Sequence, residues 1–325
     1  MASNGNMHKN NKIAIVGSGL IGRSWAMIFA SAGYQVTLYD ILPSQVSTAL
    51  ENIKGRLDDL KKAGQLRGSL SPEEQFSLIT GTNELKEAIQ GAGFVQECVP
   101  EVLELKRKVF KQMEEFAGDE TILSSSSSCI TPSEITETLQ RRKQCVVSHP
   151  VSPPYYAPLV EIIPAPWTDQ AVVDKTRALM EEVGQVPVTL RRELPGFALN
   201  RMQYALINES WRLVQNGLLS CADVDKVMWA GMGMRYAFIG PFEVMHLNAE
   251  GMASYLERYS KTIQNVSADF GPNPTFDGEG YKQIIKEMDE LIPLDQLEER
   301  RKARDARMAA LAKLKHDMDG HEKTD

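Results

Sequence analysis

The chain has 325 residues and a formal net charge of −7, with 42% hydrophobic and 24% charged residues. This composition is typical of a globular protein of about two domains, and the acidic balance argues against a general nucleic-acid surface. No run approaches the roughly 20 apolar residues of a membrane span, and the polar start Met1–Asn11 lacks the apolar core of a secretion signal. We therefore expect a cytoplasmic protein without nucleic-acid or membrane partners.

The four cysteines and five histidines do not form a metal-binding pattern. The sequence contains no CxxC pair, no HExxH motif and no Cys/His cluster. We expect reduced thiols and no metal site.

The segment Lys12–Asp40 has the pattern of a nucleotide-binding β-α-β unit. A buried-strand pattern over Ile13–Val16 leads into the six residues GSGLIG, then a helical pattern, and then a second strand that ends at Asp40. Such glycines allow a tight turn, close approach of a pyrophosphate and close packing of helix on strand. A carboxylate about 20 residues further on can bind the adenosine ribose and would repel a 2′-phosphate. The sequence therefore predicts binding of NAD rather than NADP.

The residues that follow predict the rest of an α/β domain. A helical excursion over 43–80 has a charged outer face, which is either simply solvated or part of a substrate cleft. Further strands are predicted over Gly93–Val99, Ile122–Leu123, Cys145–Ser148, Leu159–Ile163 and Val183–Leu190.

A run of five serines, Ser124–Ser128, lies between a predicted strand and a predicted helix. Low-complexity serine runs are often linkers. Here Thr131-Pro132-Ser133-Glu134 is a capping box with proline at the first helical position, so a helix begins just beyond. We interpret the serines as a strand-to-helix turn at the ligand-binding edge of the sheet.

His149 follows the strand Cys145–Ser148 and begins a proline-rich turn. A histidine at a strand end is more often structural than catalytic. However, Glu161 interrupts an otherwise apolar strand twelve residues later, and a carboxylate there needs a partner. The sequence predicts that Glu161 pairs with the imidazole of His149.

Helical patterns dominate from Pro195 onward, so we place a Rossmann-type doubly wound sheet domain at 1–193 and a smaller all-α domain at 194–325. One long helix is predicted over Gly196–Asn216, with Gly217 as its C-cap and Asn200 in its first turns. The stretch Met228–Glu243 is predicted to be rich in turns, with its Met and aromatic residues forming core rather than a cofactor site. Arg235 within it is expected to need an anionic partner or ligand. Residues 294–315 are predicted to be helical and 320–325 to be a frayed tail.

These motifs resemble the 3-hydroxyacyl-CoA dehydrogenase family over nearly the whole chain, and most closely its lambda-crystallin branch, the L-gulonate 3-dehydrogenases. The resemblance is carried by IVGSGLIGRSWAMIFASAGYQVTLYD, QECVPEVLELK, SSSSSC, VVSHPVSPPYYAPLVEIIP, PGFALNR and GMGMRYAFIGPFE. Two departures from the family pattern stand out: Ser126 and Ser127 replace Asn and Thr, and Ser152 replaces the usual Asn before proline.

The resemblance implies a role for each matching residue. The nucleotide site corresponds to Gly17, Gly19, Leu20, Ile21, Gly22 and Asp40, and it continues toward the ribose and nicotinamide through Glu97, Glu101 and Lys106. The catalytic group corresponds to His149, Glu161, Ser128 and Asn200, with Ser125 at the first position of the serine motif and Arg235 as a candidate ligand of a substrate carboxylate.

The resemblance also implies an activity, the NAD-dependent oxidation of the 3-hydroxyl of a hydroxy acid. L-gulonate is the substrate in the closest branch, while a 3-hydroxyacyl-CoA thioester, 3-hydroxybutyrate and carnitine are alternatives. Two alternatives belong to other classes of function: a structural role of the crystallin type, and an NAD sensor without turnover. The family further implies a homodimer formed through the C-terminal domain.

Overall fold

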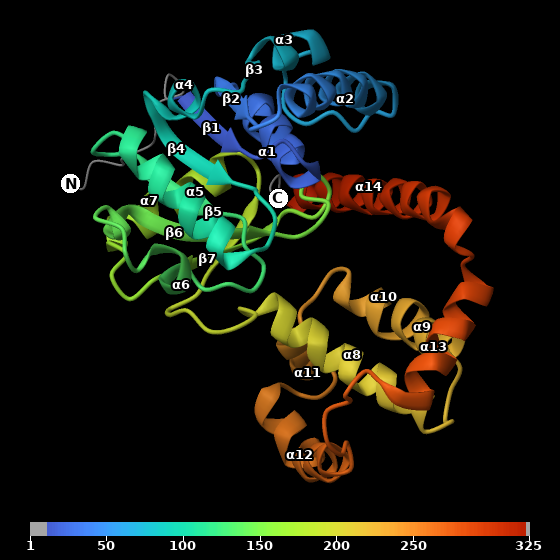
Figure 1. Cartoon of the computed structure of the whole chain (residues 1–325). Helices are drawn as coiled ribbons and strands as arrows, with labels where there is room; N and C mark the ends of the chain where they lie inside the picture. Colours follow the sequence, from blue (N-terminus) through green and yellow to red (C-terminus); the bar gives the residue numbers. More distant parts are fainter. Residues whose placement is uncertain (1–11, 323–325) are drawn as a thin grey trace. The chain divides into compact units, whose positions relative to one another are not determined.

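A computed structural model of the chain describes residues 12–322, which form two compact units (Figure 1). The first unit extends to Arg201 and also includes Met308–Lys313, and the second comprises Met202–Arg307 and resumes at Leu314. The first unit therefore continues past the predicted boundary at residue 193. The start Met1–Asn11, for which we expect no secretion signal, lies outside the described residues.

The first unit contains an eight-stranded sheet with the order β3-β2-β1-β4-β5-β6-β7-β8. Its neighbouring strands are parallel, except that β6 and β7 pair antiparallel. The strands are β1 Lys12–Val16, β2 Val36–Tyr39, β3 Ile79–Thr82, β4 Ala92–Glu97, β5 Ile122–Ser125, β6 Cys145–Pro150, β7 Leu159–Pro164 and β8 Val186–Thr189. The order reverses between β1 and β4, and ligands of doubly wound sheets bind beyond the strand ends at such a point.

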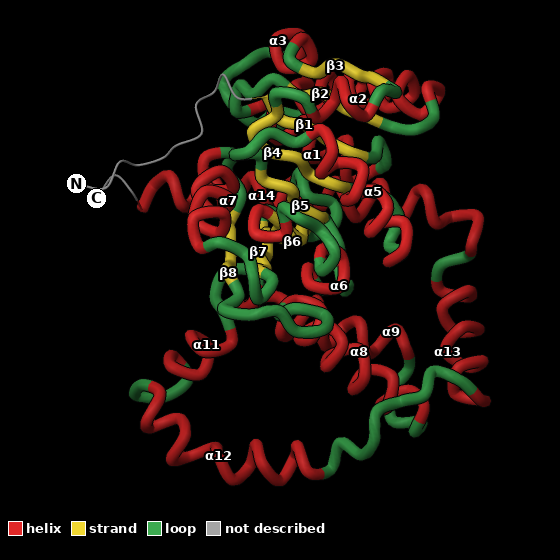
Figure 2. Tube along the Cα trace, turned by 60° about the vertical axis from the view of Figure 1, so that its left-hand side comes forward, coloured by secondary structure: helices red, strands yellow, loops and turns green. Residues whose placement is uncertain are grey.

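Helices cover both faces of this sheet (Figure 2). The side chains of β1 show that both faces are buried, because they point alternately to the two faces. Ile13 and Ile15 belong to one buried cluster, whereas Ala14 and Val16 belong to the other. The first cluster includes α1 Leu20–Ser31, α2 Pro43–Lys62 and α7 Gln170–Glu182, and the second includes α4 Leu85–Ile89, α5 Leu103–Phe116 and α6 Pro132–Thr136. The predicted α/β fold of Rossmann type is confirmed.

The excursion after β2 is not helical throughout. It contains α2, α3 Pro72–Ser77 and then the edge strand β3, which the sequence analysis missed. The strand has only four residues and is interrupted by Gly81, where an added Cβ would collide with Val46 of α2, so it is too short to stand out in the sequence. The predicted capping box that begins α6 is present, and α3 begins with a capping box at Ser71 as well.

The second unit is helical, as predicted. Its elements are α8 Leu199–Gln215, α9 Cys221–Lys226, the π-helix η2 Val227–Met232, α10 Gly233–Tyr236, α11 Pro241–Leu247, α12 Met252–Ala268, α13 Gly278–Leu291, the 3₁₀ helix η3 Leu294–Gln296 and α14 Leu297–Glu322, while the short 3₁₀ helix η1 Arg142–Gln144 belongs to the first unit. The N-terminal turn of α8 and the segment Met308–Lys313 of α14 belong to the first unit.

Three predictions about these helices were wrong in detail. The helix α8 does not begin at Gly196, because Gly196 and Phe197 have φ angles of 73° and 51°, which a right-handed helix cannot contain. Helices rather than turns fill most of 228–243, and α14 continues to Glu322 where a frayed tail was expected. The predicted C-cap at Gly217 is confirmed, since its φ is 69° and Leu218 donates to the carbonyl of Leu213.

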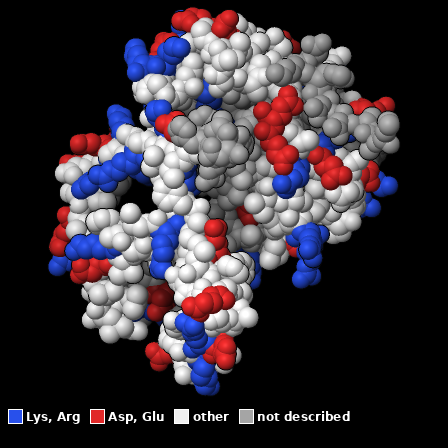
Figure 3. All heavy atoms as spheres, turned by 180° about the vertical axis from the view of Figure 1, so that it is seen from behind, with Lys and Arg blue, Asp and Glu red and all other residues white. Residues whose placement is uncertain are grey.

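Acidic and basic side chains are interspersed on the face of the molecule that Figure 3 displays. Within residues 12–322, every helix is too short or too polar to cross a membrane. The described residues also contain no group of three or more His, Cys, Asp or Glu side chains that could hold a metal ion.

Candidate active site

The glycine-rich turn between β1 and α1 is shaped by backbone contacts. Gly17 has a φ of 109°, and a Cβ there would lie 2.8 Å from the carbonyl group of Cys98, while a Cβ on Gly22 would collide with the carbonyl oxygen of Gly17. An added Cβ at Gly19 would instead meet open space. Gly17 and Gly22 are therefore required by the fold, whereas the surface in front of Gly19 is free for a ligand.

Asp40, at the end of β2, faces this turn. Its Oδ2 accepts hydrogen bonds from the backbone N–H of Ser18 at 3.0 Å and from the Ser18 hydroxyl at 2.7 Å. Its Oδ1 accepts from the N–H of Leu42 at 3.2 Å. A carboxylate has about four acceptor positions, so Asp40 is held in orientation and keeps capacity for the hydroxyls of a ribose.

His149 and Glu161 lie directly opposite each other on the antiparallel strands β6 and β7. The Nδ1 atom of His149 is 2.9 Å from Oε2 of Glu161, and both side chains are buried. The other oxygen, Oε1, accepts from the N–H groups of Ala198 and Leu199 at 2.8 and 2.9 Å. Burial favours the neutral form of Glu161, but these hydrogen bonds outweigh it and lower the pKa of the carboxyl group. The predicted pair is present, and Glu161 also anchors the start of α8.

Phe197 was not singled out by the sequence analysis, although it supports this pair. Its ring is fully buried, and its centroid lies 5.6 Å from that of His149. A φ of 51° is unusual for a bulky residue. The left-handed Gly196–Phe197 turn aims the next two N–H groups at Glu161. The only sequence signal is a Pro-Gly pair directly before the aromatic residue.

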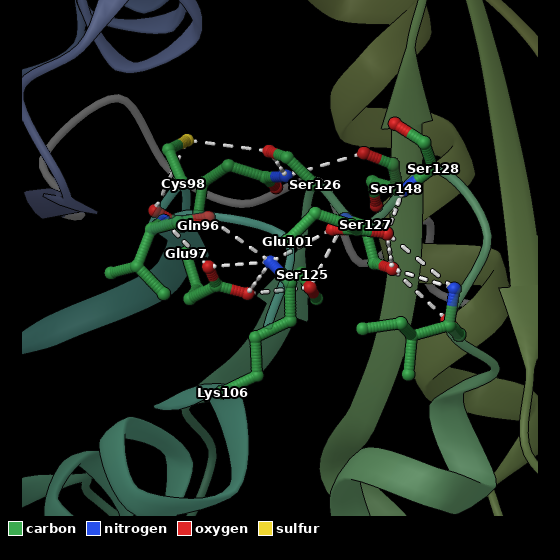
Figure 4. Close-up of polar contacts among 12 residues, drawn as sticks. Gln96, Glu97, Cys98, Glu101, Lys106, Ser125, Ser126, Ser127, Ser128 and Ser148 are labelled. Atoms are coloured by element: carbon green, nitrogen blue, oxygen red, sulfur yellow. Dashed lines mark hydrogen bonds and ion pairs between the residues drawn. The ribbon is translucent and has the colours of Figure 1, made fainter. Parts of the chain in front are cut away.

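The serine turn after β5 is held by an acidic side chain from the segment between β4 and α5 (Figure 4). Oε1 of Glu101 accepts from the hydroxyl of Ser127 at 2.6 Å and from the N–H groups of Ser128 and Cys129 at 2.9 and 3.1 Å. Partial burial favours protonation of Glu101, but the bond from Ser127, the ammonium of Lys106 and the backbone donors together lower its pKa. The predicted turn is present over Ser126–Ser128, whereas Ser124 and Ser125 belong to β5.

Glu97 and Lys106 form an ion pair beneath this turn (Figure 4). The Nζ atom of Lys106 lies 2.9 and 3.0 Å from the two oxygens of Glu97 and 3.4 Å from Oε2 of Glu101. Glu97 also accepts from the Ser125 hydroxyl at 2.5 Å. Burial raises the pKa of Glu97, whereas Lys106 and Ser125 favour the carboxylate.

Both members of this pair are buried, and so is Ser125. The exposed fractions of Glu97 and Lys106 are 0% and 1%, and the Ser125 hydroxyl donates to Glu97. The contacts with the cofactor that the resemblance implies for these three residues stay predictions. All three support the turn from below, and only Glu101 is partly exposed.

Both serines of the first departure from the family pattern are accommodated by internal hydrogen bonds. Ser126 accepts from Nε2 of Gln96 at 2.7 Å, and Ser127 donates to Glu101. Ser152, the second departure, precedes a cis peptide bond to Pro153.

Asn200, in the first turn of α8, reaches the serine turn. Its Nδ2 atom donates to the backbone oxygen of Ser128 at 2.8 Å and lies 3.4 Å from Sγ of Cys129. The backbone of Ser128 is thus held at its N–H by Glu101 and at its carbonyl by Asn200. Its hydroxyl has no partner among the described residues. The structure therefore brings Ser128 and Asn200 together.

Arg235 lies on α10 in the second unit, and its side chain is exposed. Its guanidinium group is open to solvent, and the expected anionic partner or ligand of Arg235 stays a prediction.

The first unit fits a dinucleotide. The first turn of α1 has N–H groups without intrahelical acceptors, and no side chain caps this helix. These donors, the open space before Gly19 and the oriented carboxylate of Asp40 suit a pyrophosphate and a ribose. Together with a buried His–Glu pair, they define a nicotinamide-dependent oxidoreductase.

Comparison with known proteins gives the family. The chain matches the NAD-binding domain of 3-hydroxyacyl-CoA dehydrogenase over residues 12–194 and the C-terminal domain of the same enzyme over residues 196–277. It belongs to the 3-hydroxyacyl-CoA dehydrogenase family and carries the family's NAD-binding domain.

Relatives cover most of the chain. Lambda-crystallin of Oryctolagus cuniculus is 53% identical over 308 residues, which are 94% of this chain and 97% of that protein. L-carnitine dehydrogenase of Oceanobacillus iheyensis is 32% identical over 256 residues, 78% of this chain and 81% of that protein.

A solved structure shares the fold. A 5-formyl-3-hydroxy-2-methylpyridine 4-carboxylic acid 5-dehydrogenase, described as an NAD+-dependent dismutase, matches with a TM-score of 0.81 at 24% identity. The match covers 96% of this chain and 99% of that one.

Proposed function

We propose that this chain oxidises the 3-hydroxyl group of L-gulonate to 3-dehydro-L-gulonate, with NAD as the hydride acceptor. The observation that carries the reaction type is the buried His149–Glu161 pair at 2.9 Å, on the first unit that also holds the dinucleotide-binding turn. L-gulonate is the substrate implied by the resemblance to the lambda-crystallin branch, and the 53% identity to rabbit lambda-crystallin supports it.

His149 acts as the general base. Because its Nδ1 faces Glu161, its Nε2 is the nitrogen that can take the substrate hydroxyl proton. The carboxylate of Glu161 fixes this tautomer and stabilises the imidazolium that forms. The Ser128 hydroxyl and the Asn200 side chain hold the reacting oxygen, which accumulates charge as the carbonyl forms. Bound NAD supplies the hydride acceptor.

Arg235 is our candidate for the substrate carboxylate. Its exposed guanidinium group can form a bidentate pair with a carboxylate. We expect Arg235→Ala to raise KM for L-gulonate far more than KM for NAD. An unchanged KM for L-gulonate would remove Arg235 from the site.

Two other substrates within this class are supported by the comparisons. L-carnitine is a 3-hydroxy acid, and an L-carnitine dehydrogenase is 32% identical to this chain. A 3-hydroxyacyl-CoA thioester is supported by the family models. A structural role of the crystallin type is an alternative from another class of function. The intact His149–Glu161 pair supports a catalytic role in addition to it.

The deciding experiment follows NADH formation with L-gulonate, L-carnitine and 3-hydroxybutyryl-CoA in parallel. We expect turnover with L-gulonate, and a loss of about 10²- to 10⁴-fold in His149→Gln, the range for a general base. Turnover with only the thioester or only L-carnitine would replace the substrate. Binding of NAD without turnover of any of them would contradict the catalytic proposal.

We also propose that the chain forms a homodimer through its second unit. That unit exposes many large apolar side chains, among them Trp229 at 67% and Phe242 at 74%, and their burial between two copies would be favourable. Sedimentation should give the mass of a dimer, and Phe242→Glu should shift it toward the monomer. A wild-type monomer at micromolar concentration would contradict the proposal.

A cytoplasmic location stays a prediction.

A further inference from the structure

The acidic side chain of Glu101 has an unusual set of partners. Its Oε1 atom accepts from one hydroxyl and two backbone N–H groups of the serine turn, with the N–H of Ile130 at 3.5 Å. The turn carries Ser128, whose hydroxyl faces no partner among the described residues. Glu101 therefore holds the peptide that presents the hydroxyl.

Glu101 is itself fixed from the interior. Lys106 is 1% exposed and lies 3.4 Å from Glu101, and its other neighbours are both oxygens of the fully buried Glu97 and the carbonyl of Val99. Glu97 in turn accepts from the N–H of Val99 at 2.6 Å and from Ser125. A buried ammonium with this many acceptors has little freedom to move. The row Glu97–Lys106–Glu101 joins the ends of β4 and β5 (Figure 4).

We propose that Glu101 is a positioning residue, which sets the orientation of Ser128 for the hydroxy acid, and that Lys106 and Glu97 hold Glu101 in place. This inference rests on the proposed function for its catalytic consequence. Its structural part, that Glu101 holds the turn, is independent of the substrate. A group that touches only the cofactor would change KM for NAD, whereas a positioning group for Ser128 changes kcat.

The kinetic test is a double-mutant cycle between Glu101→Ala and Ser128→Ala. A misplaced reacting group costs up to about a hundredfold, so Glu101→Ala should lower kcat by about tenfold to a hundredfold in the wild-type background. In the Ser128→Ala background the same change should have little further effect. Glu101→Gln keeps an acceptor oxygen and should recover part of kcat. Glu104→Ala, which removes an exposed carboxylate from the first turn of α5 three residues further on, is the matched control.

A second readout does not need turnover. Cys129 is the exposed one among the four cysteines, and it lies in the turn. Burial raises the pKa of Cys98 to about 12 and of Cys221 to about 11, and it also raises the pKa of Cys145, so these thiols react slowly. We expect Cys129 to react faster with a disulfide reagent in Glu101→Ala than in wild type or Glu104→Ala, and Cys129→Ser to abolish the fast phase.

Three outcomes would overturn the proposal. The first is that Glu101→Ala lowers kcat by the same factor in the Ser128→Ala background as in the wild-type background. The second is a rise in KM for NAD with kcat unchanged, and the third is unchanged reactivity of Cys129 in Glu101→Ala. If wild type turns over none of the hydroxy acids, the proposed function fails, while the reactivity of Cys129 still decides whether Glu101 holds the turn.

Discussion

Two carboxylates, Glu161 and Glu101, hold the two halves of the candidate site in similar ways but with different partners. Each directs one oxygen at successive backbone N–H groups, those of Ala198 and Leu199 for Glu161 and those of the serine turn for Glu101. The second oxygen of Glu161 meets an imidazole, whereas that of Glu101 meets an ammonium. The imidazole is the proposed general base, whereas the buried ammonium is a fixed partner of two carboxylates. The charge of Glu161 therefore bears on chemistry, and that of Glu101 bears on geometry.

The substitution Glu161→Gln tests this difference between the two carboxylates, and we expect it to have the largest effect. The amide keeps the shape but cannot stabilise the imidazolium of His149, so kcat should fall by about 10²- to 10⁴-fold, as for loss of general base catalysis. NADH binding, measured by fluorescence, should be unchanged. Glu181→Gln on the surface of α7 is the control, and a loss of kcat no larger than in Glu101→Gln would contradict the distinction.

Phe197 distinguishes the two halves further, because it supports only the His149 half. Phe197→Ala should lower the free energy of unfolding by about 3–5 kcal/mol, the usual cost of removing a buried phenylalanine. Phe197→Gly should be no less stable than Phe197→Ala in urea unfolding, because glycine adopts the φ of 51° without strain. A glycine variant that is about 1 kcal/mol less stable than the alanine variant, as in an ordinary segment, would show that the turn is unstrained.

The two halves also differ in how far the sequence predicts them. The His149–Glu161 pair follows from sequence because a carboxylate in an apolar strand needs a partner, and the antiparallel register places the two opposite each other. The Gly–Ser–Gly turn and Asp40 follow from strand–helix spacing. The interior role of Lys106 does not follow, because a lysine among Arg107, Lys108 and Lys111 has no local sign of burial. The positive φ of Phe197 and the strand β3 likewise depend on tertiary contacts.

Ser18, in the glycine-rich turn between β1 and α1, offers a test with a smaller expected effect. Its hydroxyl donates to Asp40 at 2.7 Å, so Ser18→Ala removes one of the bonds that orient this carboxylate. A hydrogen bond contributes roughly 1 kcal/mol, so KM for NAD should rise by about fivefold while kcat stays the same. A fall in kcat at saturating NAD would show that Ser18 bears on the catalytic groups.

The smallest expected effect is on acid stability, and it compares the two carboxylates directly. The pKa of Glu161 and that of Glu101 are both lowered in the folded chain. A lowered pKa means that each contribution is present above the ordinary pKa of glutamate, about 4.3, and is lost as the pH falls through the folded value. Glu101→Gln and Glu161→Gln should therefore each reduce the loss of unfolding free energy between neutral and acidic pH. Glu161→Gln should reduce it more, because Glu161 is buried whereas solvent screens the partly exposed Glu101. Urea unfolding across this pH range measures the free energy of unfolding of both variants. If this free energy changed with pH equally in the two variants, exposure would not determine the contribution of each carboxylate.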